Sequence, residues 1–379
     1  MKKFKFLGLM CYTLLLLIFG WSTSYAERFP LENKTNEPVL AEVKKPFNFE
    51  SILQRTKEAI VMLSTSPNVD AETDPRSNGL CAGVVVSDSG HILTNFHCIY
   101  QQNYIKLIYY SEHDYELHDV NVIGLDPLAD LALIQVTSDV KPKSYIKFAD
   151  DIENISPGTE VFAFGHPMGM AWTLTKGIIS SNERYMRHPY IKSLQTDAAI
   201  NKGNSGGPLL NMKGEIIGIN SMIISKTMEN AGVGIAVRGD IVKKSLESML
   251  ENGRVDRPAV GIMIMGLVNP KTKDKIMKDY PNIKPAHVPN TLGLWVRPGT
   301  VPEGLKAYDT IIGVNGVMIN DGLEFSEELG KCNIGDKVSL TIIRKRVFHK
   351  VEVTLKVLPV NAADIYPRKT PNMLPAPKR

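Results

Sequence analysis

Three residues of this chain have side chains suited to a hydrolytic reaction: His97, Asp130 and Ser205. Ser205 lies in the stretch "NKGNSGGPLL", residues 201–210, between an asparagine and two glycines. Glycine permits backbone conformations that are closed to other residues and leaves space beside a hydroxyl. Such a loop can also turn successive N–H groups toward one point, where they would stabilise an oxyanion. On the motif alone, a plain glycine turn between two strands is the alternative interpretation.

His97 and Asp130 would supply the base and the orienting group that a serine nucleophile needs. His97 ends the strand-like run "HILTNFH", and Asp130 leads directly into the apolar run "LALIQV". Taken singly, each has an ordinary interpretation, as a structural histidine or as a cap or turn aspartate. The order His, Asp, Ser matches one of the known chain orders of a serine-protease triad. The sequence therefore predicts peptide-bond hydrolysis through an acyl-enzyme, with the imidazole taking the serine proton.

Many short strand-like runs surround these residues, a pattern typical of an all-β barrel or sandwich. They include "CAGVVVSD", "HILTNFHCI", "LALIQV", "EVFAFG", "EIIGINSMII" and "GVGIAV". Before them, "FNFESILQRTKEAIVMLST" passes from helical to strand-like spacing. After them, "DIVKKSLESMLENG" predicts an amphipathic helix that ends at Gly253.

A length of 379 residues predicts two domains with appendages. The expected division is a linker at 27–49, a protease domain at 50–253, a smaller domain at 259–358 and a disordered tail at 359–379. The segment "RVDRP" would form the hinge between the two domains.

The first 26 residues have the features of a secretory signal peptide. A basic start precedes an apolar stretch at 6–21, and the small residues Ser24 and Ala26 precede the expected cut. An uncleaved membrane anchor is the alternative, since the apolar stretch is only slightly short of a spanning helix. Either interpretation places the rest of the chain outside the cytoplasm, in the periplasm or the extracellular space.

The composition is that of an ordinary soluble globular protein, with 43% hydrophobic and 22% charged residues. The net charge of +4 comes largely from Lys2, Lys3 and Lys5; without them, 41 basic residues stand against 40 acidic ones. This balance gives no sign of a nucleic-acid partner.

The blocks "TNFHC", "DPLADLALIQV" and "QTDAAINKGNSGGPLLN" resemble those of the HtrA (Deg) family of trypsin-like serine proteases. The resemblance implies a mainly β fold with two perpendicular six-stranded β-barrels, the active site between them, and one PDZ domain after them. It makes His97 the general base and acid, Asp130 its orienting group and Ser205 the nucleophile. It also makes the backbone N–H groups of Gly203 and Ser205 the oxyanion hole.

The same resemblance implies a homotrimer that needs no cofactor and no metal and that cleaves misfolded or exposed protein segments. Contact with a membrane is expected only if the stretch at 6–21 stays as an anchor. The alternative function is a peptide-binding chaperone or stress sensor with weak or conditional proteolysis.

Ala199 lies six residues before Ser205, where trypsin-like enzymes of basic specificity carry an aspartate. This position predicts an uncharged substrate pocket for medium-sized aliphatic side chains, with simple packing of Ala199 as the alternative. His166 lies in "GHPMGMAWTLTKG", which resembles the family's regulatory loop, and is expected to be structural rather than catalytic.

The block "RPAVGIMI" resembles the carboxylate-binding loop of a PDZ domain. Loop N–H groups there would hold a peptide C-terminus while the peptide adds a strand to the sheet edge. The matching residues are Ala259, Val260, Gly261 and Ile262. An unliganded packing domain is the alternative, and the insert "NPKTKDKIMKDYPNIKPAHVPN" departs from a minimal PDZ domain.

Cys81 and Cys98 are the expected disulfide pair, because Cys11 would leave with the signal and Cys332 lies in the other domain. Export favours a persisting disulfide, and strands joined by one turn bring such residues within bonding range. Trypsin-like proteases outside the HtrA family often carry a bridge beside the catalytic histidine, whereas HtrA members usually have a small apolar residue there. Two buried free thiols are the alternative.

Overall fold

The structure, a computed structural model, describes residues 49–68, 79–111, 116–167, 170, 172–185, 188, 190–223, 232–266, 270–360 and 362. The predicted signal or anchor, nearly all of the predicted linker and most of the predicted tail lie outside these residues. Among the described residues, no helix has both the length and the apolar character that crossing a bilayer requires.

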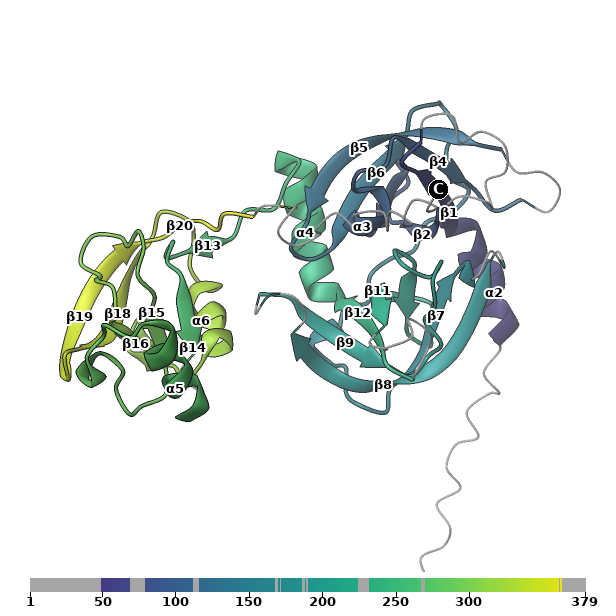
Figure 1. Cartoon of the computed structure of the whole chain (residues 1–379). Helices are drawn as coiled ribbons and strands as arrows, with labels where there is room; N and C mark the ends of the chain where they lie inside the picture. Colours follow the sequence, from purple (N-terminus) through teal and green to yellow (C-terminus); the bar gives the residue numbers. More distant parts are fainter. Residues whose placement is uncertain are drawn as a thin grey trace, which may run out of the picture. The chain divides into compact units, whose positions relative to one another are not determined.

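The first six strands form a closed antiparallel barrel in the order β1-β2-β3-β6-β5-β4, drawn in purple to blue in Figure 1. Helix α2 (Phe49–Thr56) and the 3-10 turn η1 (Lys57–Ala59) lead into it. A one-turn helix, α3 (Phe96–Ile99), follows β3. The strands are β1 (Ile60–Ser66), β2 (Gly79–Val85), β3 (His91–Thr94), β4 (Tyr104–Ile108), β5 (His118–Asp126) and β6 (Leu131–Val136).

The next six strands form a second closed barrel in the order β10-β11-β12-β9-β8-β7 (Figure 1). The strands are β7 (Glu160–Gly165), β8 (Thr173–Tyr185), β9 (Lys192–Thr196), β10 (Pro208–Leu210), β11 (Ile216–Ile223) and β12 (Gly234–Arg238), with the short turn η3 (Ile152–Asn154) before them. The prediction of two six-stranded barrels is confirmed. Closure leaves neither barrel with an exposed strand edge.

Both barrels contribute to one hydrophobic core. Val61 and Leu133 of the first barrel and Phe162 of the second are fully buried and belong to the same cluster. Every residue of β1 is buried, because one face of this strand lines the barrel and strand β7 of the other barrel packs beside it. The two barrels are therefore packed on each other, and the loops at their junction are held on rigid strands.

Helix α4 (Gly239–Asn252) follows the second barrel and ends as predicted at Gly253. Gly253 has a left-handed φ of 68°, and its N–H donates to the carbonyl of Met249. Residues 254–258 then return to the first barrel, where the Arg257 guanidinium makes two hydrogen bonds of 2.8 and 2.6 Å to Asp126. Asp126 is fully buried and also accepts a hydrogen bond from Ser245 of α4, so its carboxylate joins the helix and Arg257 to the first barrel.

The smaller domain contains a sheet in the order β14-β15-β16-β18-β19, with β17 paired to β16 and a separate β13-β20 pair. Its strands are β13 (Pro258–Ala259), β14 (Ile264–Gly266), β15 (Leu294–Val296), β16 (Thr310–Val314), β17 (Val317–Met318), β18 (Lys337–Arg344), β19 (Val347–Thr354) and β20 (Lys356–Val357). Asp321 caps helix α6 (Gly322–Leu329), and its carboxylate accepts the N–H groups of Leu323 and Glu324.

The insert of the smaller domain builds its own small core. It contains helix α5 (Pro270–Asp279) and the 3-10 turn η5 (Pro285–His287). Ile276, Ile283 and Trp295 are buried against one another. The indole N–H of Trp295 donates to the carbonyl of His287 at 2.8 Å, so the insert covers this side of strand β15.

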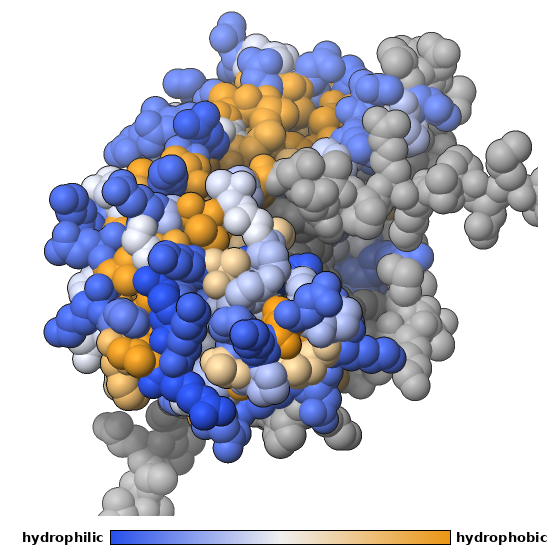
Figure 2. Space-filling view, turned by 60° about the vertical axis from the view of Figure 1, so that its left-hand side comes forward, coloured by the Kyte–Doolittle hydropathy of each residue, from blue (hydrophilic) through white to orange (hydrophobic). Residues whose placement is uncertain are grey.

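Hydrophilic residues cover much of the face drawn in Figure 2, with hydrophobic residues exposed between them. Large hydrophobic side chains exposed in the described structure include Met318 of β17 and Phe348 of β19. Exposed apolar side chains are ordinary on the surface of soluble proteins.

Candidate active site

His97 lies on helix α3, not on a strand as the run "HILTNFH" suggests. Strand β3 ends at Thr94, and the backbone turns there because Asp130 offers its carbonyl to the next residues. The Asn95 side-chain amide donates to this carbonyl at 2.8 Å and the Phe96 N–H at 3.2 Å. The turn brings His97 beside the residue that precedes strand β6.

The Asp130 carboxylate holds His97 through two of its groups. His97 Nδ1 lies 2.8 Å from Asp130 Oδ2, and the His97 backbone N–H donates to Oδ1 at 3.0 Å. Asp130 is 1% exposed and has a left-handed φ of 59°. A proton on Nδ1 directed at the carboxylate leaves Nε2 as the basic nitrogen of the imidazole.

Ser221 is a further member of this cluster that the sequence analysis missed. Its hydroxyl donates to Asp130 Oδ2 at 2.6 Å, and the residue is buried on strand β11. The only signal was a serine within the apolar run "EIIGINSMII", since a buried hydroxyl needs a hydrogen-bond partner. Ser221 thereby helps to orient the carboxylate that holds His97.

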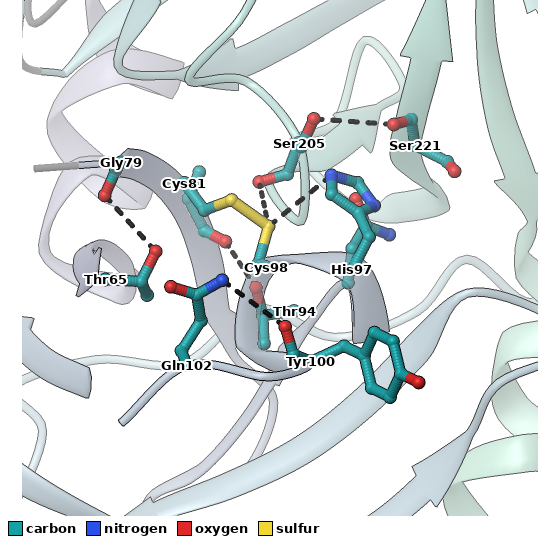
Figure 3. The surroundings of a disulfide bond; sticks show 12 residues. Thr65, Gly79, Cys81, Thr94, His97, Cys98, Tyr100, Gln102, Ser205 and Ser221 are labelled. Atoms are coloured by element: carbon teal, nitrogen blue, oxygen red, sulfur yellow. Dashed lines mark hydrogen bonds between the residues drawn. A yellow bond between two sulfur atoms is a disulfide. The ribbon is translucent and has the colours of Figure 1, made fainter. Parts of the chain in front are cut away.

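Ser205 lies on the loop before β10, next to His97 and Ser221 (Figure 3). Its hydroxyl donates to the Ser221 carbonyl at 3.4 Å. Within the part of the chain that the structure describes, no hydrogen bond joins the Ser205 hydroxyl to His97. The structure thus gathers the three predicted residues, with the serine hydroxyl directed at a backbone carbonyl.

The loop around Ser205 requires glycine at two positions. Gly203 and Gly206 have φ values of 102° and 84°. A Cβ on Gly203 would lie 2.1 Å from the His166 carbonyl oxygen, and one on Gly206 would lie 2.2 Å from that of Ala82. No other residue fits either position.

The backbone N–H groups of Gly203 and Ser205 are available to a ligand. Asn204, Gly206 and Gly207 each donate their N–H to a backbone carbonyl. In contrast, neither Gly203 nor Ser205 donates its N–H to any group of the described residues. An oxyanion hole needs such preset donors beside the nucleophile.

Ala199 is joined to the Ser205 loop through its backbone. Its carbonyl accepts hydrogen bonds from Thr175 Oγ1 at 3.0 Å and from the Asn204 side-chain amide at 3.1 Å. The residue is half-buried. Its effect on substrate choice stays a prediction.

The structure joins Cys81 and Cys98 in a disulfide with a Cα–Cα distance of 6.2 Å. Both residues are buried. The bond ties α3, which carries His97, to strand β2 of the first barrel (Figure 3). Cys332 is a free cysteine.

Removing the disulfide with the double change Cys81→Ala and Cys98→Ala is expected to lower the free energy of unfolding by about 3 kcal/mol. The expected loss arises because a closed loop, here with a sequence separation of 17, restricts the unfolded chain. Urea unfolding measures this, with Cys332→Ala as the control that removes a free thiol. Mass spectrometry of the non-reduced protein should recover the linked peptides; an unchanged unfolding midpoint would contradict the prediction.

His166 is a buried structural residue. Its Nδ1 accepts the Trp172 backbone N–H at 3.0 Å, and its Nε2–H donates to the Val61 carbonyl at 3.0 Å. Burial lowers the pKa of His166 from 6.5 to about 4. The side chain therefore links the two barrels as a neutral imidazole.

Replacing His166 with glutamine is expected to remove part of the acid sensitivity of folding. Between the unfolded pKa of 6.5 and the folded pKa of about 4, only the unfolded chain binds this proton. Wild-type stability is therefore complete above pH 6.5 and falls as the pH drops through this window. Across this window the His166 proton should lower the free energy of unfolding of the wild type by on the order of 3 kcal/mol.

Urea unfolding at about pH 7 and about pH 4.5 measures this difference. His349→Gln, on an exposed strand position, is the matched control. If wild type and His166→Gln lose the same stability on acidification, His166 does not cause the acid sensitivity.

The predicted peptide-binding loop of the smaller domain also offers free donors. Ala259 and Val260 are buried, and Gly261 has a left-handed φ of 75°. Within the described residues, none of Val260, Gly261 and Ile262 donates its N–H to the protein. Three consecutive donors suit a terminal carboxylate, and this role stays a prediction.

Comparisons with known proteins agree with this architecture. The profile of the trypsin-like peptidase domain matches residues 81–219, and that of the PDZ domain matches residues 289–355. A probable periplasmic serine endoprotease, DegP-like, of Brucella suis biovar 1 (strain 1330) is 31% identical over 290 residues, covering 73% of this chain and 52% of the relative. A probable serine protease do-like of Buchnera aphidicola subsp. Acyrthosiphon pisum (strain APS) is 35% identical, covering 77% and 59%.

The chain thus spans about half the length of the first of these relatives. Among solved structures, the HtrA-type protease AlgW with a decapeptide has the same fold, with a TM-score of 0.69, 24% identity and coverage of 83% of this chain and all of that chain. A serine endoprotease from Yersinia pestis has a TM-score of 0.63 at 26% identity, with coverage of 83% of this chain and all of that chain.

Proposed function

Since the chain belongs to the HtrA/Deg family of trypsin-like serine proteases with a C-terminal PDZ domain, we propose that it is a serine endopeptidase. His97, Asp130 and Ser205 would act as one catalytic unit. The observation that carries this proposal is the His97 Nδ1 to Asp130 Oδ2 contact of 2.8 Å beside Ser205. The N–H groups of Gly203 and Ser205, which donate to no group among the described residues, support the same assignment.

In the proposed reaction, the Ser205 hydroxyl turns from the Ser221 carbonyl to His97 Nε2, which takes its proton. The serine oxygen attacks the scissile carbonyl, whose oxygen becomes negatively charged and accepts the N–H groups of Gly203 and Ser205. His97 then gives its proton to the leaving amine. Asp130 stays ionised and stabilises the imidazolium, and water hydrolyses the acyl-enzyme by the same steps.

The proposed substrates are exposed segments of other proteins. Ala199 would give an uncharged pocket beside the serine loop. The N–H groups of Val260, Gly261 and Ile262, which donate to none of the described residues, would bind a peptide carboxylate. Location in the periplasm or extracellular space and assembly as a homotrimer are parts of the proposal. The relatives are named serine endoproteases, which favours a protease over a chaperone or stress sensor.

Labelling with a fluorophosphonate tests the proposed function. The reagent modifies a serine only where a base and an oxyanion hole activate it. We expect one label per chain, at Ser205, with labelling and casein cleavage rising when denatured substrate is present. Absence of labelling in folded protein, with and without denatured substrate, would reject the catalytic assignment.

A chain that ends at Pro258 is expected to fold and to label as fast as the full chain. All three proposed catalytic residues lie before this point, and the cut keeps Arg257, which pairs with buried Asp126. The matched control, a chain that ends at Asp256, lacks this ion pair and should be less stable, since an unpaired buried charge is costly. Failure of the longer chain to fold would refute the proposed boundary between 50–253 and 259–358.

A further inference from the structure

Three potential metal-binding atoms meet beside the serine loop. They are the sulfurs of Cys81 and Cys98 and a ring nitrogen of His97, and all three lie within 4.8 Å of one another. In the disulfide, the two sulfurs are bonded to each other (Figure 3). Reduction would convert them into two thiols on the same rigid elements, next to an imidazole.

The spacing of these atoms suits tetrahedral zinc. With Zn–S and Zn–N bonds of about 2.3 and 2.05 Å, a sulfur and a nitrogen at two corners lie about 3.6 Å apart. Cys98 Sγ lies 3.7 Å from His97 Nε2. Two sulfurs at such corners lie about 3.8 Å apart, and two thiolate sulfurs that are no longer bonded must separate toward this distance.

The surroundings of His97 already resemble the second shell of a zinc site. Metal-binding histidines usually donate their other ring N–H to a carboxylate, which fixes the tautomer and raises the basicity of the ligand nitrogen. Asp130 accepts from Nδ1 at 2.8 Å, which leaves the Nε2 lone pair on the side of the Cys98 sulfur. This contact orients the ring independently of the cysteines.

Burial and charge also favour a metal here. Cys81 and Cys98 are 8% and 3% exposed, whereas the His97 side chain is 32% exposed, so the site opens to solvent beside the imidazole. One Zn²⁺, two thiolates and a neutral imidazole sum to zero charge, which avoids the cost of a buried net charge. The fourth position is left for water.

We propose that reduction of the Cys81–Cys98 disulfide creates a Zn²⁺ site formed by Cys81, Cys98 and His97. The reductant is a dithiol: it passes two electrons and two protons to the bridge, the S–S bond breaks, and the dithiol closes to its own disulfide. Zn²⁺ then displaces both thiol protons, which pass to solvent. Because the metal occupies His97 Nε2, it blocks the proton acceptor; this consequence for catalysis rests on the proposed function, whereas metal binding does not.

Cobalt is the probe for the site, because Co²⁺ replaces Zn²⁺ and absorbs light when thiolates bind it. Ser205→Ala protein is reduced with dithiothreitol, freed of it by anaerobic gel filtration, and titrated with Co²⁺. We expect one Co²⁺ per chain, with a thiolate-to-cobalt charge-transfer band and tetrahedral d–d bands. The unreduced protein and a Cys81→Ala/Cys98→Ala variant should show neither the charge-transfer band nor the tetrahedral d–d bands.

A His97→Gln change in the same background tests the third ligand. It should weaken cobalt binding at least about tenfold, the loss typical even for groups that only support a ligand. Unchanged affinity overturns the three-residue site. Absence of the charge-transfer band in reduced protein overturns it too, as does loss of native tryptophan fluorescence on reduction, because the site requires the folded barrel.

The inhibition is measured on the wild-type chain with a peptide substrate. Zn²⁺ should lower the rate of the reduced enzyme at least about tenfold, a chelator should restore it, and the unreduced enzyme should be unaffected. If the reduced enzyme binds cobalt but cleaves peptide at an unchanged rate in the presence of Zn²⁺, the proposal that the metal blocks His97 is wrong. If no form cleaves peptides while the cobalt bands are present, the proposed function fails and the metal site stands.

Discussion

Replacement of Ser205 with alanine is expected to lower kcat for casein hydrolysis by about 10⁵-fold or more, to the level left by binding and the oxyanion hole. The change removes the hydroxyl oxygen that lies next to His97 in Figure 3 and that would attack the substrate carbonyl. Little stability should be lost, because among the described residues the hydroxyl makes one hydrogen bond, of 3.4 Å, to the Ser221 carbonyl. Casein cleavage and fluorophosphonate labelling measure the loss of activity.

The matched control is Ser181→Ala, which removes a hydroxyl of strand β8 that donates to the Glu183 carbonyl. It should leave both cleavage and labelling unchanged. Circular dichroism and the urea midpoint show whether each variant is folded. Residual cleavage near the wild-type rate in folded Ser205→Ala protein would remove Ser205 from the mechanism.

The architecture could be predicted from the sequence because its signals are local. Short apolar runs broken by Gly, Asn, Asp and Pro indicate strands, and the three quoted blocks resemble one family closely enough to imply two closed barrels. Helix α4 ended at Gly253 as expected, because a left-handed C-terminal cap favours glycine.

The finer geometry of the site depends on tertiary contacts that no local pattern contains. The carbonyl of Asp130 ends strand β3 and starts the turn that carries His97, by accepting from Asn95 across 35 residues of sequence. Ser221 lies 91 residues from the carboxylate that it orients. The Ser205 hydroxyl donates to the carbonyl of the same Ser221, on strand β11. Neither of these two contacts of Ser221 could be derived from the spacing of residues in the sequence.

The disulfide could be predicted only in part from the sequence. Strands β2 and β3 pair directly, with Val84 opposite Leu93, so the expected hairpin exists and carries both cysteines close to its open end. Sequence could not show that Cys98 Sγ would lie 3.7 Å from His97 Nε2. That distance follows from the one-turn helix α3, which replaced the expected strand end.

Replacement of Asp130 with asparagine is expected to lower kcat by about 10⁴-fold while leaving the fold intact. The carboxylate accepts the His97 backbone N–H at Oδ1 and both the His97 ring and the Ser221 hydroxyl at Oδ2. An asparagine amide has only one acceptor atom. If its oxygen keeps the backbone N–H, its NH₂ group faces His97 Nδ1 and donates to it.

The imidazole would then carry its proton on Nε2, the nitrogen that must accept the proton of Ser205. If the amide is turned the other way, its oxygen still accepts from His97 Nδ1, but its NH₂ group opposes the His97 backbone N–H and that hydrogen bond is lost. In either orientation no negative charge remains to stabilise the imidazolium. Each orientation therefore reduces general-base catalysis. Rates of peptide cleavage and of fluorophosphonate labelling should fall together, because both require an activated serine.

Asp119→Asn is the matched control, since this carboxylate of the same barrel is 67% exposed and pairs only with Lys106 at 2.7 Å among the described residues. It should cleave and label at the wild-type rate. Ser221→Ala should lower the rates of cleavage and labelling less than Asp130→Asn does, because it keeps the carboxylate. It removes one hydrogen bond to a charged group, worth about 1.5 to 3 kcal/mol. If folded Asp130→Asn protein has a kcat within about tenfold of the wild-type value, His97 holds its productive tautomer without the carboxylate. That result would contradict the expected loss of about 10⁴-fold.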